Sequence, residues 1–484
     1  MSKAVGWAER ELLTAGLGDE RLDKRAAKLL TSLGNRPNVS IPAACGGHAE
    51  TQAAYRFFDN RKVTFQKVLA PHLQRTQERM AAQDLVLLVQ DTTELDLSRP
   101  TRPVKGAGPL DGSRRGLLLH EQHAFTAGGT PLGTVDAQIL CRQMLHRDAA
   151  EREPSVSHRK WCRQTPLEQK ESVRWIQGLR RARQVAAQLP GTRCISVADS
   201  EADLYEWFAE PRAEADQTPA LDWIVRACHD RLLEDQQHQH VQQAALATPV
   251  LYRTKLKVRA RRTRMATRKN LKRKRQTSRR ARTARVQVRA ATLTLRPPWR
   301  EGGVKLPAVT VNVVLVSETR PPKGEPPVQW LLITTLPVAS VEQVRSIVKY
   351  YCVRWNIELL FRTLKGGCRI EQRRLETTDR MLPCLALYLI VAWRTQWVCR
   401  LSREHPDADC QVLLAPSEWK SVWKATQGKL PKQPPKLSLM VRLSAALGGY
   451  IAGPGREPGV QTVWIGLQRM RDLAWAWDAF GPGS

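Results

Sequence analysis

Apolar side chains recur at helical spacing in the first part of the chain. Residues 22–33 show this spacing with lysines and an arginine between the apolar positions, which predicts a basic helix. A second helix is expected in HAETQAAYRFFDN, where Asp59 and Asn60 provide a stop signal. These residues alone favour a small DNA-binding module and a surface helix bundle with solvated lysines about equally.

The pattern then changes to that of strands. The apolar run from Leu85 to Val89 suits a strand buried on both faces and ends in Gln90-Asp91. Residues 116–140 predict two antiparallel strands joined around Gly128-Gly129. After a helical stretch at 168–189, the strand-like run 194–198 ends at Asp199.

Strand and helix signals continue to the end of the chain. Strands are expected at 309–316 and 330–335, and a long amphipathic helix at 341–365, stopped by Gly366-Gly367. Residues 375–484 are predicted to be mainly helical. The alternation of strands and helices indicates an α/β fold.

The charge of the chain indicates its partner. The 484 residues carry a formal net charge of +31, which suits a polyanion and makes nucleic acid the expected partner. Residues 253–289 hold 18 Lys or Arg and no Asp or Glu, although most such runs are simply solvated. An anionic membrane is the rival partner. The longest apolar run, residues 381–393, contains Pro383 and is too short to span a bilayer, so we expect a buried helix.

The N-terminus and the cysteines indicate the compartment. MSKAVGWAER lacks the pattern of a secretory signal, so we expect the protein in a reducing cytoplasm. The ten cysteines form no C-x-x-C pair, which indicates neither a zinc knuckle nor a disulfide framework.

Three acids are candidates for a catalytic site. Asp91 and Asp199 each end a predicted buried strand, where a carboxylate can be held rigidly at the edge of a core. A third acid, Glu358, lies on the helix that follows the last strand. On a straight helix, five polar residues would lie within an arc of roughly 80 degrees and form one stripe. They are Tyr351, Arg354, Glu358, Arg362 and Lys365. The opposite side, Val353, Ile357, Leu360, Phe361 and Leu364, would pack on the sheet. The alternative is a surface helix on which Glu358 forms i, i+4 ion pairs with Arg354 and Arg362.

The order Asp91, Asp199, Glu358 resembles that of the DDE transposases of bacterial insertion sequences. The spacing Y-x-x-R-x-x-x-E-x-x-x-x-x-x-K is filled by Tyr351, Arg354, Glu358 and Lys365, as in the subgroup of the IS-four and Tn-five elements. DTTEL at Asp91, DSEADLYEW at Asp199, WIVR ending at Arg226, QWLLITTLPV with Trp330, and the N-terminal HAETQAAYRFFDN extend the similarity over roughly residues 5–400. Arg362 departs from the lysine of the best-studied members.

The resemblance implies a ribonuclease-H-like catalytic core with a β-rich insertion, flanked by helical terminal domains. We expect an end-binding domain at 1–75, a catalytic domain at 76–375 with a basic insertion at about 230–325, and a dimerisation domain at 376–484. Asp91, Asp199 and Glu358 would hold two Mg²⁺ or Mn²⁺ ions. The expected DNA contacts are Arg226, Trp330, Tyr351, Arg354, Arg362 and Lys365. Trp330 would stack on a flipped base or, alternatively, be a core tryptophan.

The implied activity is cut-and-paste transposition, through nicking, hairpin formation and strand transfer. The partners would be the element's terminal repeats, target DNA and a second copy of the chain, in the bacterial cytoplasm with the nucleoid, with neither a membrane nor a small-molecule substrate. Two alternatives remain: a catalytically inactive transposase-derived DNA-binding protein or inhibitor, and a general nuclease of the same fold.

Other acids and histidines near these motifs receive simpler interpretations. Glu94, Asp96, Glu201 and Asp203 are expected to support the proposed ligands or to be solvated. His120 and His123 in HEQH lie in a strand-like region and are expected to be core or surface histidines, because the helical zinc motif has a different spacing.

Overall fold

A computed structural model describes residues 6–99, 102–142, 165–212, 221–235, 237–258, 280–300, 305–453 and 455–481. The central part of the basic run, 259–279, lies outside these residues. The chain forms two compact units, each described by itself: residues 1–155 with 355–484, and residues 156–354.

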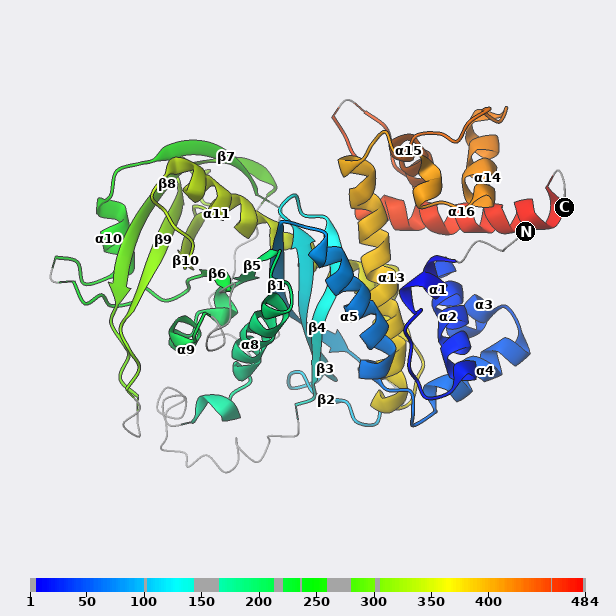
Figure 1. Ribbon diagram of the computed structural model, residues 1–484, viewed down its shortest axis with the longest axis horizontal. Helices are drawn as coiled ribbons and strands as arrows, with labels where there is room; N and C mark the ends of the chain where they lie inside the picture. The colour runs from blue at the N-terminus through cyan, green and yellow to red at the C-terminus, as the bar shows by residue number, and fades with distance from the viewer. Residues whose placement is uncertain are drawn as a thin grey trace. The chain divides into compact units, whose positions relative to one another are not determined.

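The first unit begins with helices, several of which start at a short polar side chain. They are α1 (Trp7–Glu11), α2 (Glu20–Asn35), α3 (Ile41–Cys45), α4 (His48–Phe58) and α5 (Phe65–Ala81) (Figure 1). Asp19 accepts a hydrogen bond from the Arg21 N–H at the start of α2, and Thr64 accepts one from the Lys67 N–H at the start of α5. The helices predicted at 22–33 and 48–60 are confirmed.

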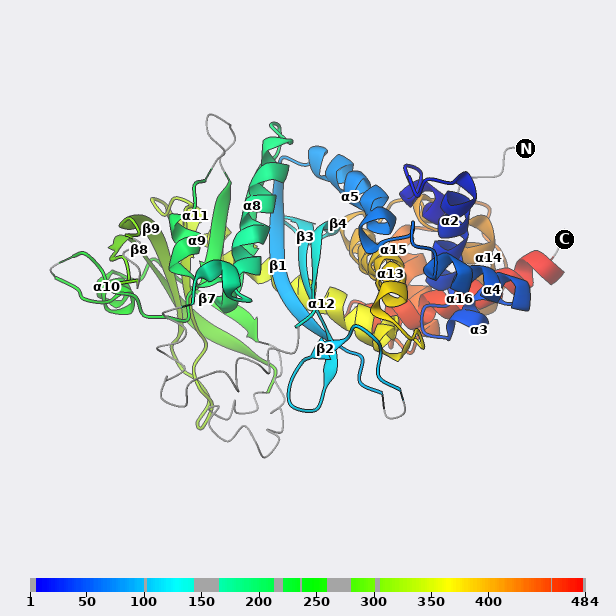
Figure 2. The same cartoon turned by 90° about the horizontal axis from the view of Figure 1, so that it is seen from below.

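The strands of the first unit form an antiparallel sheet. They are β1 (Leu85–Asp96), β2 (Gly108–Pro109), β3 (Arg115–Thr126) and β4 (Pro131–Leu140). β3 pairs with β1, β2 and β4, and the β3–β4 turn contains Gly128-Gly129 as predicted. Figure 2 shows β1, β3 and β4 side by side, with α5 and α13 (Thr378–Glu404) near β4.

The expectation that the first strand ends at Asp91 is wrong. β1 continues to Asp96 and pairs Asp91 with Glu121 in mid-strand. The β-branched Thr92 and Thr93 and the buried Leu95 continue the strand pattern beyond the apolar run. Asp91 therefore lies on a rigid, paired part of the strand.

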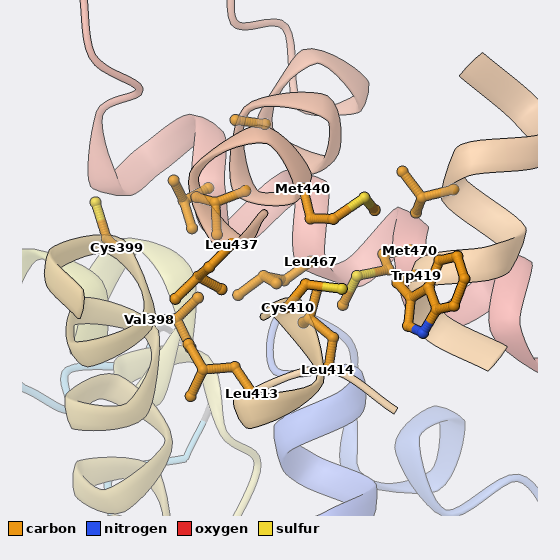
Figure 3. Packing of buried hydrophobic residues seen from close by; sticks show 14 residues of the cluster. Val398, Cys399, Cys410, Leu413, Leu414, Trp419, Leu437, Met440, Leu467 and Met470 are labelled. Atoms are coloured by element: carbon orange, nitrogen blue, oxygen red, sulfur yellow. The ribbon is translucent and has the colours of Figure 1, made fainter. Parts of the chain in front are cut away.

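The C-terminal helices of the first unit surround an apolar core. They are α12 (Trp355–Arg362), α13, α14 (Pro416–Gln427), α15 (Leu437–Leu447) and α16 (Val460–Phe480). Figure 3 shows part of this core, including Val398, Leu437, Leu467 and Trp419. Among the described residues α13 alone has the length and composition of a membrane-spanning helix, but 83% of its apolar window is buried inside the protein. The predicted buried helix at 381–393 is confirmed.

The second unit contains an extended sheet. α8 (Val173–Ala187) precedes β5 (Arg193–Ala198), and α9 (Tyr205–Ala209) precedes β6 (Asp222–Arg226), which is parallel to β5. The sheet continues from β6 through antiparallel β10 (Gln329–Thr334), β9 (Val309–Glu318), β8 (Arg282–Leu295) and β7 (Tyr252–Val258). Strands β7 to β9 and α10 (Val241–Ala247) form the expected β-rich insertion (Figure 1). The mixed α/β architecture confirms the α/β fold expected from the sequence.

The predicted continuous helix over 341–365 is wrong. α11 (Val341–Val353) ends at Arg354, whose N–H donates to the Tyr351 carbonyl instead of the carbonyl four residues back. α12 then begins at Trp355, and residues Thr363–Gly367 form a π-turn closed by a bond from the Cys368 N–H to the Thr363 carbonyl. The five polar residues therefore do not form one straight stripe.

Candidate active site and DNA-contact residues

The Asp91 carboxylate lies on β1, which pairs with β3 in the first unit. Asp91 is half-buried, and its Oδ1 accepts a hydrogen bond of 2.8 Å from the Thr92 N–H. Its cross-strand neighbour Glu121 is fully buried and accepts hydrogen bonds from Thr134 Oγ1 (2.8 Å) and from His123 Nδ1 (2.9 Å). The hydrogen bonds of Glu121 hold the backbone opposite Asp91 in a fixed position.

Glu358 lies on α12, which packs against β1 in the same unit. The apolar side of α12 is buried through Ile357, Leu360 and Phe361, as the sequence predicts, and Glu358 is half-buried. The unit therefore brings the elements of Asp91 and Glu358 into contact. The orientation of α12 against β1 follows from the burial of the apolar side of α12.

Asn356 anchors this helix, and the sequence motifs did not identify it. Its Nδ2 donates to the Gly129 carbonyl at 3.1 Å, and its Oδ1 accepts from Arg400 Nη2 at 2.8 Å. Gln396 Nε2 also donates to the Asn356 carbonyl at 2.8 Å. α12 is thus fixed to the β3–β4 turn on one side and to α13 on the other, two residues before Glu358.

Two basic residues of the predicted stripe, Arg362 and Lys365, differ in their exposure to solvent. Arg362 is exposed at the end of α12. Lys365 is half-buried in the π-turn, with its Nζ 3.7 Å from a carboxylate oxygen of Glu371. Glu371 in turn accepts a hydrogen bond of 2.9 Å from the Asp96 N–H of β1. Lys365 is therefore linked to the end of the strand that carries Asp91.

Asp199 follows β5 in the second unit, as predicted. Its Oδ1 accepts the Glu201 N–H at 2.8 Å, and its Oδ2 lies 3.9 Å from Arg226 Nη2. Arg226 also donates to Ser200 Oγ at 3.0 Å. A cation from the end of β6 is thus fixed beside the second aspartate.

Tyr351 and Arg354 are buried in the same unit, with exposed fractions of 0% and 2%. Burial raises the pKa of the Tyr351 hydroxyl; the charges of Arg226 and Arg354 lower it, and the charge of Asp199 raises it. The Trp330 ring on β10 packs edge-on against Tyr351, with centroids 5.3 Å apart. Five of the sequence-predicted residues, Asp199, Arg226, Trp330, Tyr351 and Arg354, are therefore neighbours in one unit.

The flanking acids have defined partners. Glu94 and Asp96 face Arg114 at 2.8 and 3.8 Å, and exposed Glu201 pairs with Arg174 at 2.9 Å. Asp203 is expected from the sequence either to support the site or to be solvated. The second alternative is wrong, because the Asp203 side chain is fully buried. It pairs with Arg231 and accepts the N–H groups of Cys228 and His229, so it shapes the loop after β6.

The remaining metal-ligand candidates have structural explanations. His120 and His123 are buried on β3, as expected for core histidines in a strand-like region. Asp203, Cys228 and His229 place possible ligand atoms within 4.8 Å of one another, but the Asp203 carboxylate already forms an ion pair with Arg231. The cysteines among the described residues are free, as predicted.

Comparison with protein families agrees with this arrangement. Residues 4–63 match the family described as Transposase DNA-binding, 179–392 the Transposase DDE domain, and 390–475 the Transposase Tn5 dimerisation domain. Asp199 and Glu358 fall inside the DDE match, and Asp91 lies before it. DDE transposases generally use divalent metal ions, and the terminal matches indicate DNA binding and dimerisation. The three matches follow one another in the order of a transposase, and the chain belongs to the Tn5-like DDE transposases.

Proposed function

We propose that the protein is a cut-and-paste transposase of the subgroup marked by Tyr351, Arg354, Glu358 and Lys365. It binds the terminal inverted repeats of its own insertion sequence, cuts the DNA there and joins the 3′ ends to target DNA. The observation that carries the proposal is the gathering of Asp199, Arg226, Trp330, Tyr351 and Arg354 in one unit. An ordinary surface helix would not bury a tyrosine and an arginine beside an aspartate.

The proposed metal ligands are Asp91, Asp199 and Glu358. All three are half-buried carboxylates, on or directly after regular elements, so they offer the hard oxygen atoms that Mg²⁺ and Mn²⁺ prefer. Two bound ions would activate the attacking oxygen and stabilise the leaving 3′ oxygen of an in-line displacement. The protein's own contribution is to hold the acids rigidly. In the first unit the Glu121 network does so beside Asp91, and Asn356 does so beside Glu358.

The cationic residues are proposed to position the DNA. Arg226 would bind a phosphate near the cut. Tyr351 and Arg354, expected from the sequence to contact DNA, are 0% and 2% exposed, so they are proposed to support Arg226 and Asp199 from inside the unit. Arg362 is exposed and free to reach a phosphate from the end of α12, whereas Lys365 lies closer to β1. Trp330 would support a base flipped out during hairpin formation.

The proposal includes a homodimer on DNA in the bacterial cytoplasm, since two ends must be held together for two cuts. The C-terminal part, which matches the dimerisation domain, would carry this contact. The alternative is a catalytically inactive transposase-derived protein that binds the same ends.

The proposal is tested by incubating purified protein and Mg²⁺ with a duplex that contains the element's end and with a random duplex of equal length. We expect cutting at the end sequence, none on the random duplex, and full inhibition by a chelator. Binding without cutting would favour the inactive alternative, and equal cutting of both duplexes would indicate a general nuclease.

A further inference from the structure

The insertion contains a two-stranded ribbon, β7–β8, with very different faces. The pairing register places Arg253 opposite Gln287, Lys255 opposite Arg285, and Lys257 opposite Thr283. Directly opposed residues point to the same face of a sheet, so these six side chains share one face. We call this set the cationic face of the ribbon.

The other face of the ribbon is apolar and packed. Ala284, Val286 and Val288 are buried there, opposite Leu256, Thr254 and Tyr252. Arg282 also belongs to this face, and its charge is neutralised by Glu318 at 2.7 Å and by Glu325. The register is therefore fixed by burial, and it directs Arg253, Lys255, Lys257 and Arg285 outward.

The cations of the cationic face are not neutralised by any carboxylate that the structure describes. Arg253, Lys255, Lys257 and Arg285 are exposed, and within the described ranges none of them forms an ion pair. Lys255 and Arg285 oppose each other directly, and like charges in this position destabilise a sheet. A negative partner bound to the face would relieve this repulsion.

Protection of a sheet edge explains only part of this pattern. β7 is the edge strand, and lysines on edge strands discourage pairing with other chains. Arg285, however, lies on β8, which has strands on both sides. The cationic face therefore extends beyond the edge.

We propose that the cationic face binds the phosphate backbone of double-stranded DNA without reading its sequence. Cations two residues apart on a strand are spaced by about 6.7 Å, so each can reach a separate phosphate. Beside its four cations the face offers only two uncharged polar side chains, Gln287 and Thr283, so contacts to phosphates would outnumber contacts to bases. The inference rests on the proposed function and deepens it: a face that contacts phosphates without reading bases can hold any duplex that the enzyme handles, including target DNA.

The test is the salt dependence of binding, measured with a chelator present so that no cutting occurs. The variant Lys255→Gln/Arg285→Gln is compared with the wild type on a random duplex and on an end-containing duplex. Because each lost phosphate contact lowers the slope of log K against log salt by about 0.9, we expect a slope reduced by about 1.8 on both duplexes.

Two control variants complete the experiment. Arg320→Gln/Lys323→Gln removes two exposed cations from the β9–β10 loop of the same unit, and we expect the wild-type slope. Lys255→Arg/Arg285→Lys keeps the charges and should keep the slope, which separates charge from folding. An unchanged slope in the Gln variant, an equal loss in the loop variant, or a loss confined to the end-containing duplex would overturn the inference.

Its failure is distinguishable from failure of the proposed function. Cutting of end-containing DNA in the presence of Mg²⁺ tests the proposed function alone, whereas the slope is measured without metal. A protein that cuts normally but shows an unchanged slope would refute only the inference, and a protein that does not cut but shows the reduced slope would refute only the activity.

Discussion

The Asn356 side chain donates a hydrogen bond of 3.1 Å to the Gly129 carbonyl, which ties the helix of Glu358 to the turn between β3 and β4. The same side chain accepts a hydrogen bond from Arg400 of α13. A residue outside the expected motif thus fixes the helix that carries the third acid. Asn356 is a positioning residue, because it acts through Glu358.

Replacing Asn356 tests this role. Asn356→Ala leaves the buried Gly129 carbonyl without this donor, which costs about 1–3 kcal/mol, and removes one hydrogen bond from Arg400. If Glu358 shifts by about 1 Å, cutting falls by about a hundredfold. We expect the rate of cutting at saturating DNA to fall while the dissociation constant for end DNA stays within a factor of a few.

The control for this variant is Gln184→Ala at an exposed position of α8, which removes an amide without breaking a buried contact. Asn356→Asp keeps an oxygen for Arg400 but loses the donor to Gly129, and should cut at an intermediate rate. A wild-type cutting rate in Asn356→Ala, with an unchanged melting temperature, would show that the hydrogen bond does not position Glu358.

Trp330 allows a separate test of base stacking. Loss of a stacked base costs about 1–3 kcal/mol, so Trp330→Ala should reduce hairpin formation by about 10- to 100-fold. Trp330→Phe keeps an aromatic face and should retain much of the activity. The fluorescence of 2-aminopurine placed near the end of the DNA reports the flipped base.

The alternative for Trp330 is a purely structural packing against Tyr351, whose ring lies 5.3 Å away. In that case Trp330→Ala would lower the melting temperature and leave the 2-aminopurine signal of the complex unchanged. That result would remove Trp330 from the proposed DNA contacts.

A buried ion pair in the N-terminal part predicts a dependence of stability on pH. Burial raises the pKa of Glu11, but the hydrogen bond from His72 and the charges of His72 and Arg79 outweigh burial and lower it from 4.5 to about 2. A carboxyl group whose pKa is lower in the folded state stabilises the fold above its unfolded pKa. This stabilisation is lost as the pH falls from 4.5 towards 2.

The measurement is the melting temperature between pH 2 and pH 7. Glu11→Gln should melt several degrees lower than the wild type at neutral pH, and the difference should shrink below pH 4.5. Glu9→Gln, an exposed change on the same helix, serves as the control. A constant difference between wild type and Glu11→Gln across this range would contradict the assignment.

The sequence predicted the elements of this fold better than their exact limits. Runs such as 194–198 and 309–316 fold as strands because their burial follows directly from local composition. The extension of β1 beyond Asp91 depends on its pairing with β3. The break at Arg354 depends on the burial of the Tyr351 region. Neither contact can be predicted from a local sequence pattern. Asn356 was missed for the same reason, since its partners lie more than 200 residues earlier and about 40 residues later.

The central claim is that Asp91, Asp199 and Glu358 act as one set of metal ligands. The direct measurement is cutting of end DNA by Asp91→Asn, Asp199→Asn and Glu358→Gln, each with its affinity for the same DNA measured in parallel. Residues that act as a unit lose activity together, so each variant should cut about a thousandfold more slowly or worse while binding DNA normally. One variant that cuts within tenfold of the wild type would contradict the account.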